Sequence, residues 1–288
     1  MEGIYLCLDV GGTEIKAAPI EKGGNLLRPL CHFPAKAKEP KSQLLAHFTE
    51  ILEAVGVAGR EVAGLRLAFP GPFDYERGIC LLSGLDKYDA LYQVNLREEL
   101  AGRTKVVPEE IRFANDASAF ALGEMRFGQA VNALRALCIC IGTGCGSAFG
   151  LDGALAPTGT PGVPDSGHLY DTPYLDRCID DYLSRRGLMS LTLERLGEAL
   201  DGKSLAQRVA QGDERARQCF LAFGERLAEA LLPFFDAFQP DVLCLGGQIT
   251  GSAPLFLVPL EAACRVREIR LCITKDTSVS TLRGLTVL

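Results

Sequence analysis

The stretch LDVGGTEIKAAPI, residues 8–20, carries the strongest structural signal in the chain. Its apolar runs on either side of Gly11-Gly12-Thr13 are typical of two short strands joined by a tight turn, because glycine reaches turn dihedrals at no steric cost. Backbone N–H groups in such a turn can hold phosphate oxygens, and a carboxylate such as Asp9 beside them can hold the water shell of a magnesium ion. A simple hairpin turn is the alternative.

The same pattern returns later in the chain. CICIGTGCGSAFG, residues 138–150, again predicts a strand, a glycine turn and a strand, and matching Gly12 to Gly142 gives an offset of 130 residues. A third predicted strand ends at the glycine pair Gly246-Gly247. Helical patterns at residues 41–56 and 215–238 alternate with the strands, although Pro233 is expected to kink or break the second helix near its end. We therefore predict an α/β protein of two similar lobes with a cleft between them.

Composition narrows the classes of function. The chain has 288 residues and a net charge of −6, and no basic run offers a surface for nucleic acid or for an anionic membrane. No stretch approaches the roughly 20 apolar residues of a membrane span. The eleven cysteines are an odd number, scattered singly in apolar runs, which favours reduced thiols in the cytoplasm. A small-molecule substrate is the expectation.

A polar cluster follows another strand in FANDASAFALGE, residues 113–124. Asp116, where the strand gives way to a helix, could accept a proton from a hydroxyl nucleophile, as an aspartate does in phosphoryl transfer. The alternative is that Asn115 or Asp116 only caps the helix.

Together these motifs resemble those of the ROK family of repressors and sugar kinases. LDVGGTEIKAAPI, FPGPFD, FANDASAFALGE, IGTGCGSAFGLDG, SGH and FQPDVLCLGGQITGS occur in the family's order and at similar distances, over roughly residues 4–260. The resemblance implies the two-lobed actin/hexokinase-like (ribonuclease H-like) fold. We place the N-terminal lobe at residues 1–115 and the C-terminal lobe at 116–288, with the extreme C-terminus able to return to the first lobe. Repressor members carry a DNA-binding domain before the first motif, whereas Asp9 stands near the start of this sequence, so a kinase is expected.

The resemblance also assigns residues. It implies Asp116 as catalytic base, Asn115 as a sugar contact, and Asp9 as a magnesium ligand through water. The residues that it places at ATP are Asp9, Gly11, Gly12, Thr13, Lys16, Gly142, Thr143, Gly144, Gly246 and Gly247. The implied reaction transfers the γ-phosphoryl group of Mg·ATP to a sugar hydroxyl, usually the 6-hydroxyl of a hexose. Family kinases are often homodimers, and we expect the same here.

Two departures from the family pattern concern the sugar. Many members use a His and three Cys to bind structural zinc, but here only His168 and Cys178 remain, and two ligands cannot complete a tetrahedral shell. We therefore expect no structural zinc. Asp165 and Asp180 stand where the family has glutamates, so we predict Asp165, His168 and Asp180 as sugar contacts. A solvated acidic loop is the alternative.

The second departure is GLDKY, residues 84–88, where many glucose-phosphorylating members have an Asn that contacts the sugar. Gly84 occupies that position without a side chain, and Asp86, Lys87 or Tyr88 could contribute instead. The phosphoryl acceptor therefore stays open between a hexose and an N-acetylhexosamine such as N-acetylmannosamine or N-acetylglucosamine. A third hypothesis is an inactive regulator that binds sugar or nucleotide.

Overall fold

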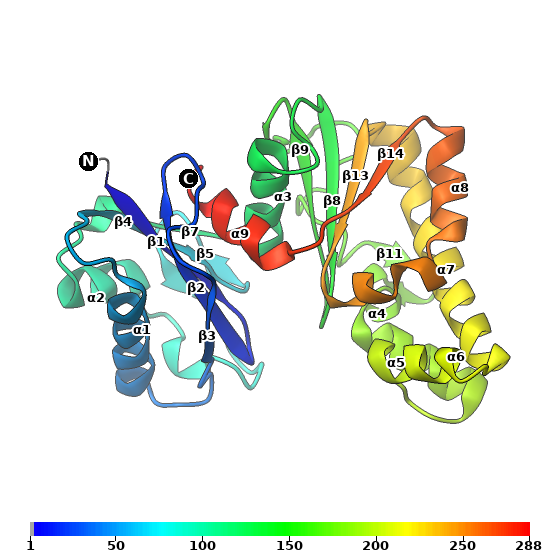
Figure 1. Cartoon of the computed structure of the whole chain (residues 1–288), viewed down its shortest axis with the longest axis horizontal. Helices are drawn as coiled ribbons and strands as arrows, with labels where there is room; N and C mark the ends of the chain where they lie inside the picture. The colour runs from blue at the N-terminus through cyan, green and yellow to red at the C-terminus, as the bar shows by residue number, and fades with distance from the viewer. Residues whose placement is uncertain (1–2) are drawn as a thin grey trace. The chain divides into compact units, whose positions relative to one another are not determined.

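The computed structural model describes residues 3–288, which form two compact units, each built on a five-stranded sheet (Figure 1). The first unit combines the described residues up to Phe127 with Ser278–Leu288, and the second contains Gly128–Thr277. A mixed α/β architecture is therefore confirmed.

The first sheet has the strand order β3-β2-β1-β4-β7. Its strands are β1 (Ile4–Val10), β2 (Glu14–Glu21), β3 (Cys31–Pro34), β4 (Val62–Ala68) and β7 (Ile111–Ala114). β1 and β2 form the antiparallel hairpin predicted from the opening motif, with Asp9 opposite Lys16, while β4 and β7 add in parallel. This topology places the ends of β1 and β7, and so Asp9 and Asn115, at one edge of the sheet.

Helices and one small hairpin complete the first unit. They are α1 (Lys41–Val55), α2 (Leu96–Arg103), α3 (Asp116–Phe127), α9 (Thr277–Leu285), the 3-10 helices η1 (Asp89–Leu91) and η2 (Pro108–Glu110), and the hairpin of β5 (Phe73–Asp74) and β6 (Ile79–Cys80). The apolar stripe of α1 is buried against the sheet, as its helical spacing predicts.

The second sheet repeats the first. Its order is β10-β9-β8-β13-β14, and its strands are β8 (Arg135–Ile141), β9 (Cys145–Leu151), β10 (Ala154–Leu155), β13 (Val242–Gly246) and β14 (Arg270–Ile273). In both sheets two antiparallel pairings are followed by two parallel ones. The internal duplication predicted from the two glycine turns is therefore a duplication of sheet topology.

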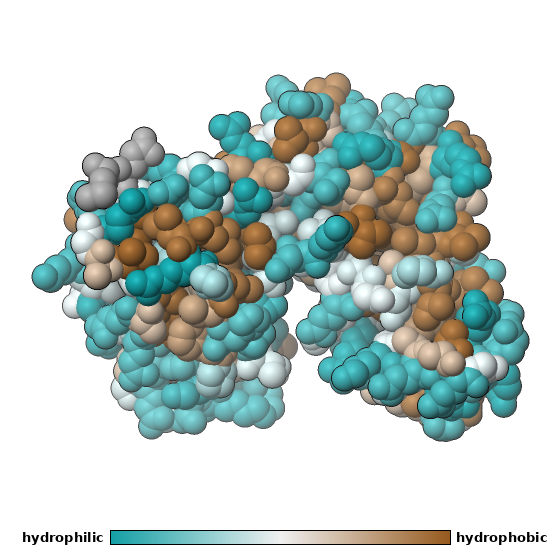
Figure 2. Space-filling model, viewed as in Figure 1, coloured by the Kyte–Doolittle hydropathy of each residue, from teal (hydrophilic) through white to brown (hydrophobic). Residues whose placement is uncertain are grey.

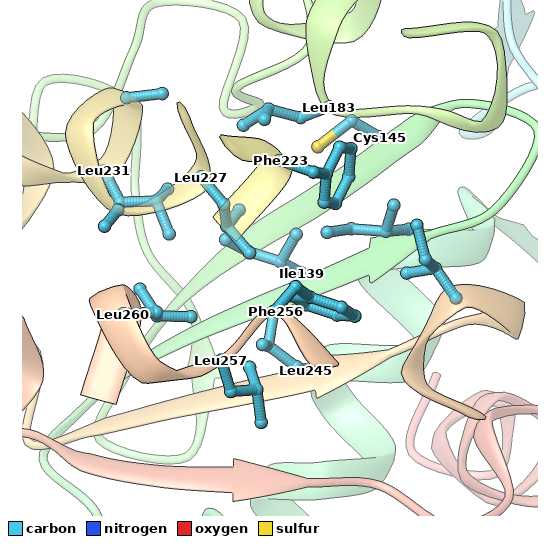
Figure 3. Close-up of a cluster of buried hydrophobic side chains, with 14 of the residues drawn as sticks. Ile139, Cys145, Leu183, Phe223, Leu227, Leu231, Leu245, Phe256, Leu257 and Leu260 are labelled. Carbon is cyan, nitrogen blue, oxygen red and sulfur yellow. The ribbon is translucent and has the colours of Figure 1, made fainter. Parts of the chain in front are cut away.

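A group of helices shares one apolar core with the second sheet. It includes α4 (Ile179–Tyr182), α5 (Arg185–Leu196), α6 (Gly202–Ala210), α7 (Glu214–Phe238), the 3-10 helix η3 (Gln248–Leu255) and α8 (Val258–Val266), beside a small hairpin of β11 (Pro173–Tyr174) and β12 (Arg177–Cys178). Phe223 and Leu227 of α7 gather with Phe256 around Ile139 and Leu245 of the sheet (Figure 3). We expected a kink or a break at Pro233, and the break is wrong, because α7 continues through Pro233 to Phe238.

Two glycines allow helices α3 and α9 of the first unit to pack closely against each other. A Cβ on Gly123 of α3 would lie 1.9 Å from the Ser280 carbonyl oxygen, and a Cβ on Gly284 of α9 would lie 1.9 Å from the Ala119 carbonyl oxygen. The backbones of α3 and α9 can approach this closely only because neither glycine has a side chain. Helix α3, which we expected to open the second lobe, thus lies in the first unit together with α9.

Hydrophilic residues cover most of each unit in the space-filling view, with apolar residues visible among them (Figure 2). Within residues 3–288 no single helix has both the length and the apolar character needed to cross a membrane, although the sharply bent pair η3 and α8 meets those two criteria together.

Candidate active site

The first glycine turn joins β1 to β2 and leaves its backbone accessible. The Gly11 N–H donates to the Glu14 carbonyl over 3.0 Å, and a Cβ on Gly11 would lie 2.7 Å from that oxygen. Any larger residue would therefore force the turn open. Gly12 and Thr13 are exposed, so their N–H groups and the Thr13 hydroxyl are available to an anion.

The charge of Asp116 acts on the carboxyl of Asp9 in the first unit. The pKa of the Asp9 carboxyl is raised from its ordinary value of 3.8 to about 7, chiefly by burial and then by the charge of Asp116, while Lys16 acts in the opposite direction. A divalent cation near the two carboxylates would relieve this cost. Mg²⁺ typically uses one or two carboxylates together with waters and substrate phosphates, so these residues fit a magnesium site. Lys16 also donates from Nζ to Ser278 Oγ over 2.6 Å.

Asn115 and Asp116 begin helix α3. Asn115 Oδ1 accepts from the N–H groups of Ala117 and Ser118 over 2.9 and 3.3 Å, so Asn115 does cap the helix. Its Nδ2 faces the Tyr75 hydroxyl at 3.5 Å. The exposed Asp116 accepts from the Ala117 N–H through Oδ1 at 2.9 Å, and Oδ2 remains available to a hydroxyl. Capping and a catalytic role are therefore compatible at this helix start.

The loop around Gly84 lies against the first glycine turn. Tyr88 is fully buried, and its hydroxyl donates to the Gly11 carbonyl over 2.8 Å. Burial, and then the charge of Asp9, raise the pKa of Tyr88, so the phenol stays protonated as a donor. Sequence reasoning named this loop but not its bond to the turn, because residues 77 positions apart share no local pattern.

In the second unit, the second and third glycine turns come together. Gly247 has a φ of 92°, and a Cβ on it would lie 2.2 Å from the Ile141 carbonyl oxygen, next to Gly142. The Gly247 N–H donates to Thr277 Oγ1 over 2.8 Å. Only glycine fits where the end of β13 passes so near the end of β8.

A cavity of about 600 Å³ opens beside these turns. Its lining includes Gly142, Arg185, Leu188, Asp201, Gly202, Lys203, Ala206, Gln207, Gln248, Ile249 and Ser252. The mixture of aliphatic, amide and basic side chains suits a purine nucleoside with phosphates attached. The sequence analysis predicted the glycines of this site but not Arg185, Lys203 or Gln248. Of these three, only Gln248 could have been found from the sequence, because it directly follows Gly247.

The three predicted sugar contacts of the second unit have different surroundings. His168 Nδ1 donates to the Ser147 carbonyl over 2.6 Å, which leaves Nε2 as the acceptor of the neutral ring. Asp180 accepts the Cys145 N–H through Oδ1 at 2.6 Å and Arg186 through Oδ2 at 2.8 Å, so it braces the second glycine turn. Asp165 is exposed.

Cys178 donates its thiol to Asp181 Oδ2 over 3.2 Å. In the part of the chain that the structure describes, no three His, Cys, Asp or Glu side chains are grouped to bind one metal ion. That the chain lacks structural zinc stays a prediction.

Comparison with known proteins adds three findings. The model of the ROK family matches residues 5–268. Glucokinase from Thermotoga maritima is 25% identical over 275 residues, covering 88% of this chain and 84% of its own, and N-acetyl-D-glucosamine kinase from Haemophilus influenzae is 26% identical over 271 residues, covering 86% and 84%. The crystal structure of a ROK hexokinase from Thermus thermophilus superimposes with a TM-score of 0.82 at 24% identity, covering 99% of this chain and 97% of that one. The fold expected from the sequence motifs is thereby confirmed.

Proposed function

The chain belongs to the ROK family, and from this we propose that it is an ATP-dependent sugar kinase that phosphorylates the 6-hydroxyl of a hexose with Asp116 as general base. The observation that carries the proposal is the group formed in the first unit by Asp9, the turn of residues 11–13 and Asp116. In this proposal Asp9 holds the hydrated metal ion, the backbone of the turn binds phosphate, and the exposed Asp116 accepts the proton of the sugar hydroxyl.

The proposed reaction forms one bond and breaks one. Oδ2 of Asp116 takes the proton of the sugar hydroxyl while the hydroxyl oxygen attacks the γ-phosphorus, and the bond to the β,γ-bridging oxygen breaks to release ADP. The first glycine turn holds phosphate oxygens through its N–H groups. A bound magnesium ion would neutralise phosphate charge, with Asp9 holding its water shell. In the second unit, the cavity near Gly142 and Gln248 would take the nucleoside.

An N-acetylhexosamine is the second candidate acceptor, and Gly84 supports it. A Cβ built on Gly84 would meet nothing within 4 Å, so this loop has room for a substituent larger than a hydroxyl. The named kinase from Haemophilus influenzae acts on such a sugar. A panel of hexoses and N-acetylhexosamines would discriminate between the two acceptors.

The test is ADP release, coupled to an absorbance change, over that panel with wild type and Asp116→Asn. Loss of the base should lower kcat by about 10²–10⁴-fold, while the sugar Kd changes little. Asp152→Asn is the matched control, because Asp152 is an exposed turn residue with a φ of 51°, which asparagine tolerates. Full turnover by Asp116→Asn would exclude Asp116 as the base. Sugar-induced thermal shifts without any ADP from wild type would instead identify a binding protein.

A further inference from the structure

The loop of residues 84–88 places a lysine directly beside the first glycine turn. Lys87 Cδ would lie only 3.5 Å from a Cβ built on Gly12, which is ordinary van der Waals contact. Its aliphatic stem therefore runs along the one side of Gly12 where other residues would carry a side chain. The ammonium is two bonds beyond Cδ, next to the backbone that we assign to phosphate.

The residues on both sides of Lys87 are anchored. Asp86 and Tyr88 have φ values of 57° and 59°, a left-handed conformation that Asp tolerates but that is uncommon for Tyr and is held there by its surroundings. The Tyr88 N–H donates to the Ala37 carbonyl over 2.6 Å, and Asp89 accepts the N–H groups of Leu85 and Asp86 over 3.2 and 3.1 Å. With Tyr88 also bonded to Gly11, the backbone of Lys87 has a fixed place beside the turn.

Lys87 has a neighbouring carboxylate that is paired with another cation. Its neighbour Asp86 forms an ion pair with Lys38 instead. Among residues 3–288, no acidic side chain forms an ion pair with Lys87. Lys87 is half-buried, its backbone is held in place, and its ammonium forms no ion pair with a described carboxylate, which favours an anionic ligand.

We propose that Lys87 contacts the phosphoryl group in transfer at the first glycine turn and neutralises part of its charge in the transition state. This inference rests on the proposed function and adds a catalytic residue to it. The phosphoryl oxygens carry most of the charge that a kinase must stabilise, and a cation that is already positioned does so without reorganisation.

The experiment compares Lys87→Met, which keeps the stem on Gly12 but removes the charge, with Lys87→Arg, which keeps the charge. Lys105→Met is the control, since Lys105 is an exposed lysine of the same unit. Using the acceptor found in the sugar panel, we expect Lys87→Met to lower kcat by about 10–100-fold with a sugar KM within about threefold of wild type. Lys87→Arg should recover most of the loss, and Lys105→Met should match wild type.

A second measurement does not depend on the acceptor. Calorimetric titration with Mg·AMPPNP and with Mg·ADP compares a nucleotide that has a γ-phosphoryl group with one that lacks it. Lys87→Met should weaken AMPPNP binding by about 10-fold and leave ADP binding unchanged. An unchanged ratio of the two affinities together with a wild-type kcat would overturn the role of Lys87 while leaving the kinase proposal intact. If wild type phosphorylates no sugar, the kinase proposal fails, and the affinity ratio still decides whether Lys87 contacts the terminal phosphoryl.

Discussion

At the scale of single residues, Asp9 of the candidate site is held where its charge costs stability. The carboxyl of Asp9 is desolvated and lies in the field of Asp116, so its charged form is disfavoured in the folded protein. The sequence indicated which residues to examine here, because Asp9, the glycine turn and Asp116 are local motifs. It could not indicate the bond from Tyr88 to Gly11 or the bracing of the second turn by Asp180, since both join residues far apart in the chain.

The raised pKa of Asp9 predicts a pH-dependent stability. Between the unfolded value near 3.8 and the folded value of about 7, the folded state binds more protons, so the free energy of unfolding falls as pH rises through this range. Asp9→Asn removes the titration. In EDTA, we expect its Tm to exceed that of wild type by roughly 3–6 °C at pH 8 and by clearly less at pH 5. Thermal melts at both pH values measure this.

Asp152→Asn serves as control for that prediction as well, with the same Tm as wild type at both pH values. Added Mg²⁺ should raise the Tm of wild type but not of Asp9→Asn. An equal Tm difference at pH 5 and pH 8 would show that Asp9 is already ionised at the lower pH.

At the scale of elements, the crossing of α3 and α9 decides which residues form the first unit. The sequence predicted α3 and its capping residues from local signals, but it placed the lobe boundary before this helix. Gly123 and Gly284 are individually unremarkable in sequence, and only the folded chain shows that each meets the backbone of the other helix. Local sequence signals predict that a helix forms. Which helix it packs against depends on residues that are far apart in the chain.

The crossing can be tested with a matched pair of glycine substitutions. Gly123→Ala places a methyl group against the Ser280 carbonyl and should lower the free energy of unfolding by about 1–3 kcal/mol. In α2, Gly102→Ala meets nothing within 4 Å and should raise it by about 0.5–1 kcal/mol, because alanine is the better helix former. Denaturant titration measures both. Equal effects of the two changes would mean that α3 and α9 do not cross as closely as described.

At the scale of the whole molecule, sequence reasoning obtained the α/β class and the duplicated halves correctly. The repeated strand, glycine turn and strand became two sheets with the same sequence of pairings. Eleven cysteines are distributed over these halves, seven of them buried and four half-buried, with no disulfide among the described residues. Burial raises the pKa of Cys264 to about 11 and raises that of Cys7 and Cys145 as well.

This distribution predicts two-phase thiol reactivity. In the native protein at pH 7.5, at most the four half-buried cysteines should react rapidly with Ellman's reagent, since burial shields the other seven thiols from it. All eleven should react in guanidinium chloride, and a reductant should leave the Tm unchanged. Rapid native reaction of more than four thiols would show that one of the two cores opens readily.

The return of Ser278–Leu288 to the first unit has a consequence for biosynthesis. The ribosome makes the first 127 residues early, but the helix that packs on Gly123 emerges only after the entire second unit has been translated. Until then, nothing packs against Gly123, and the apolar residues that later contact Leu282 and Leu285 are uncovered. The second unit is contiguous and can fold as soon as it leaves the exit tunnel, so the half of the protein that is synthesised first is the half that finishes folding last.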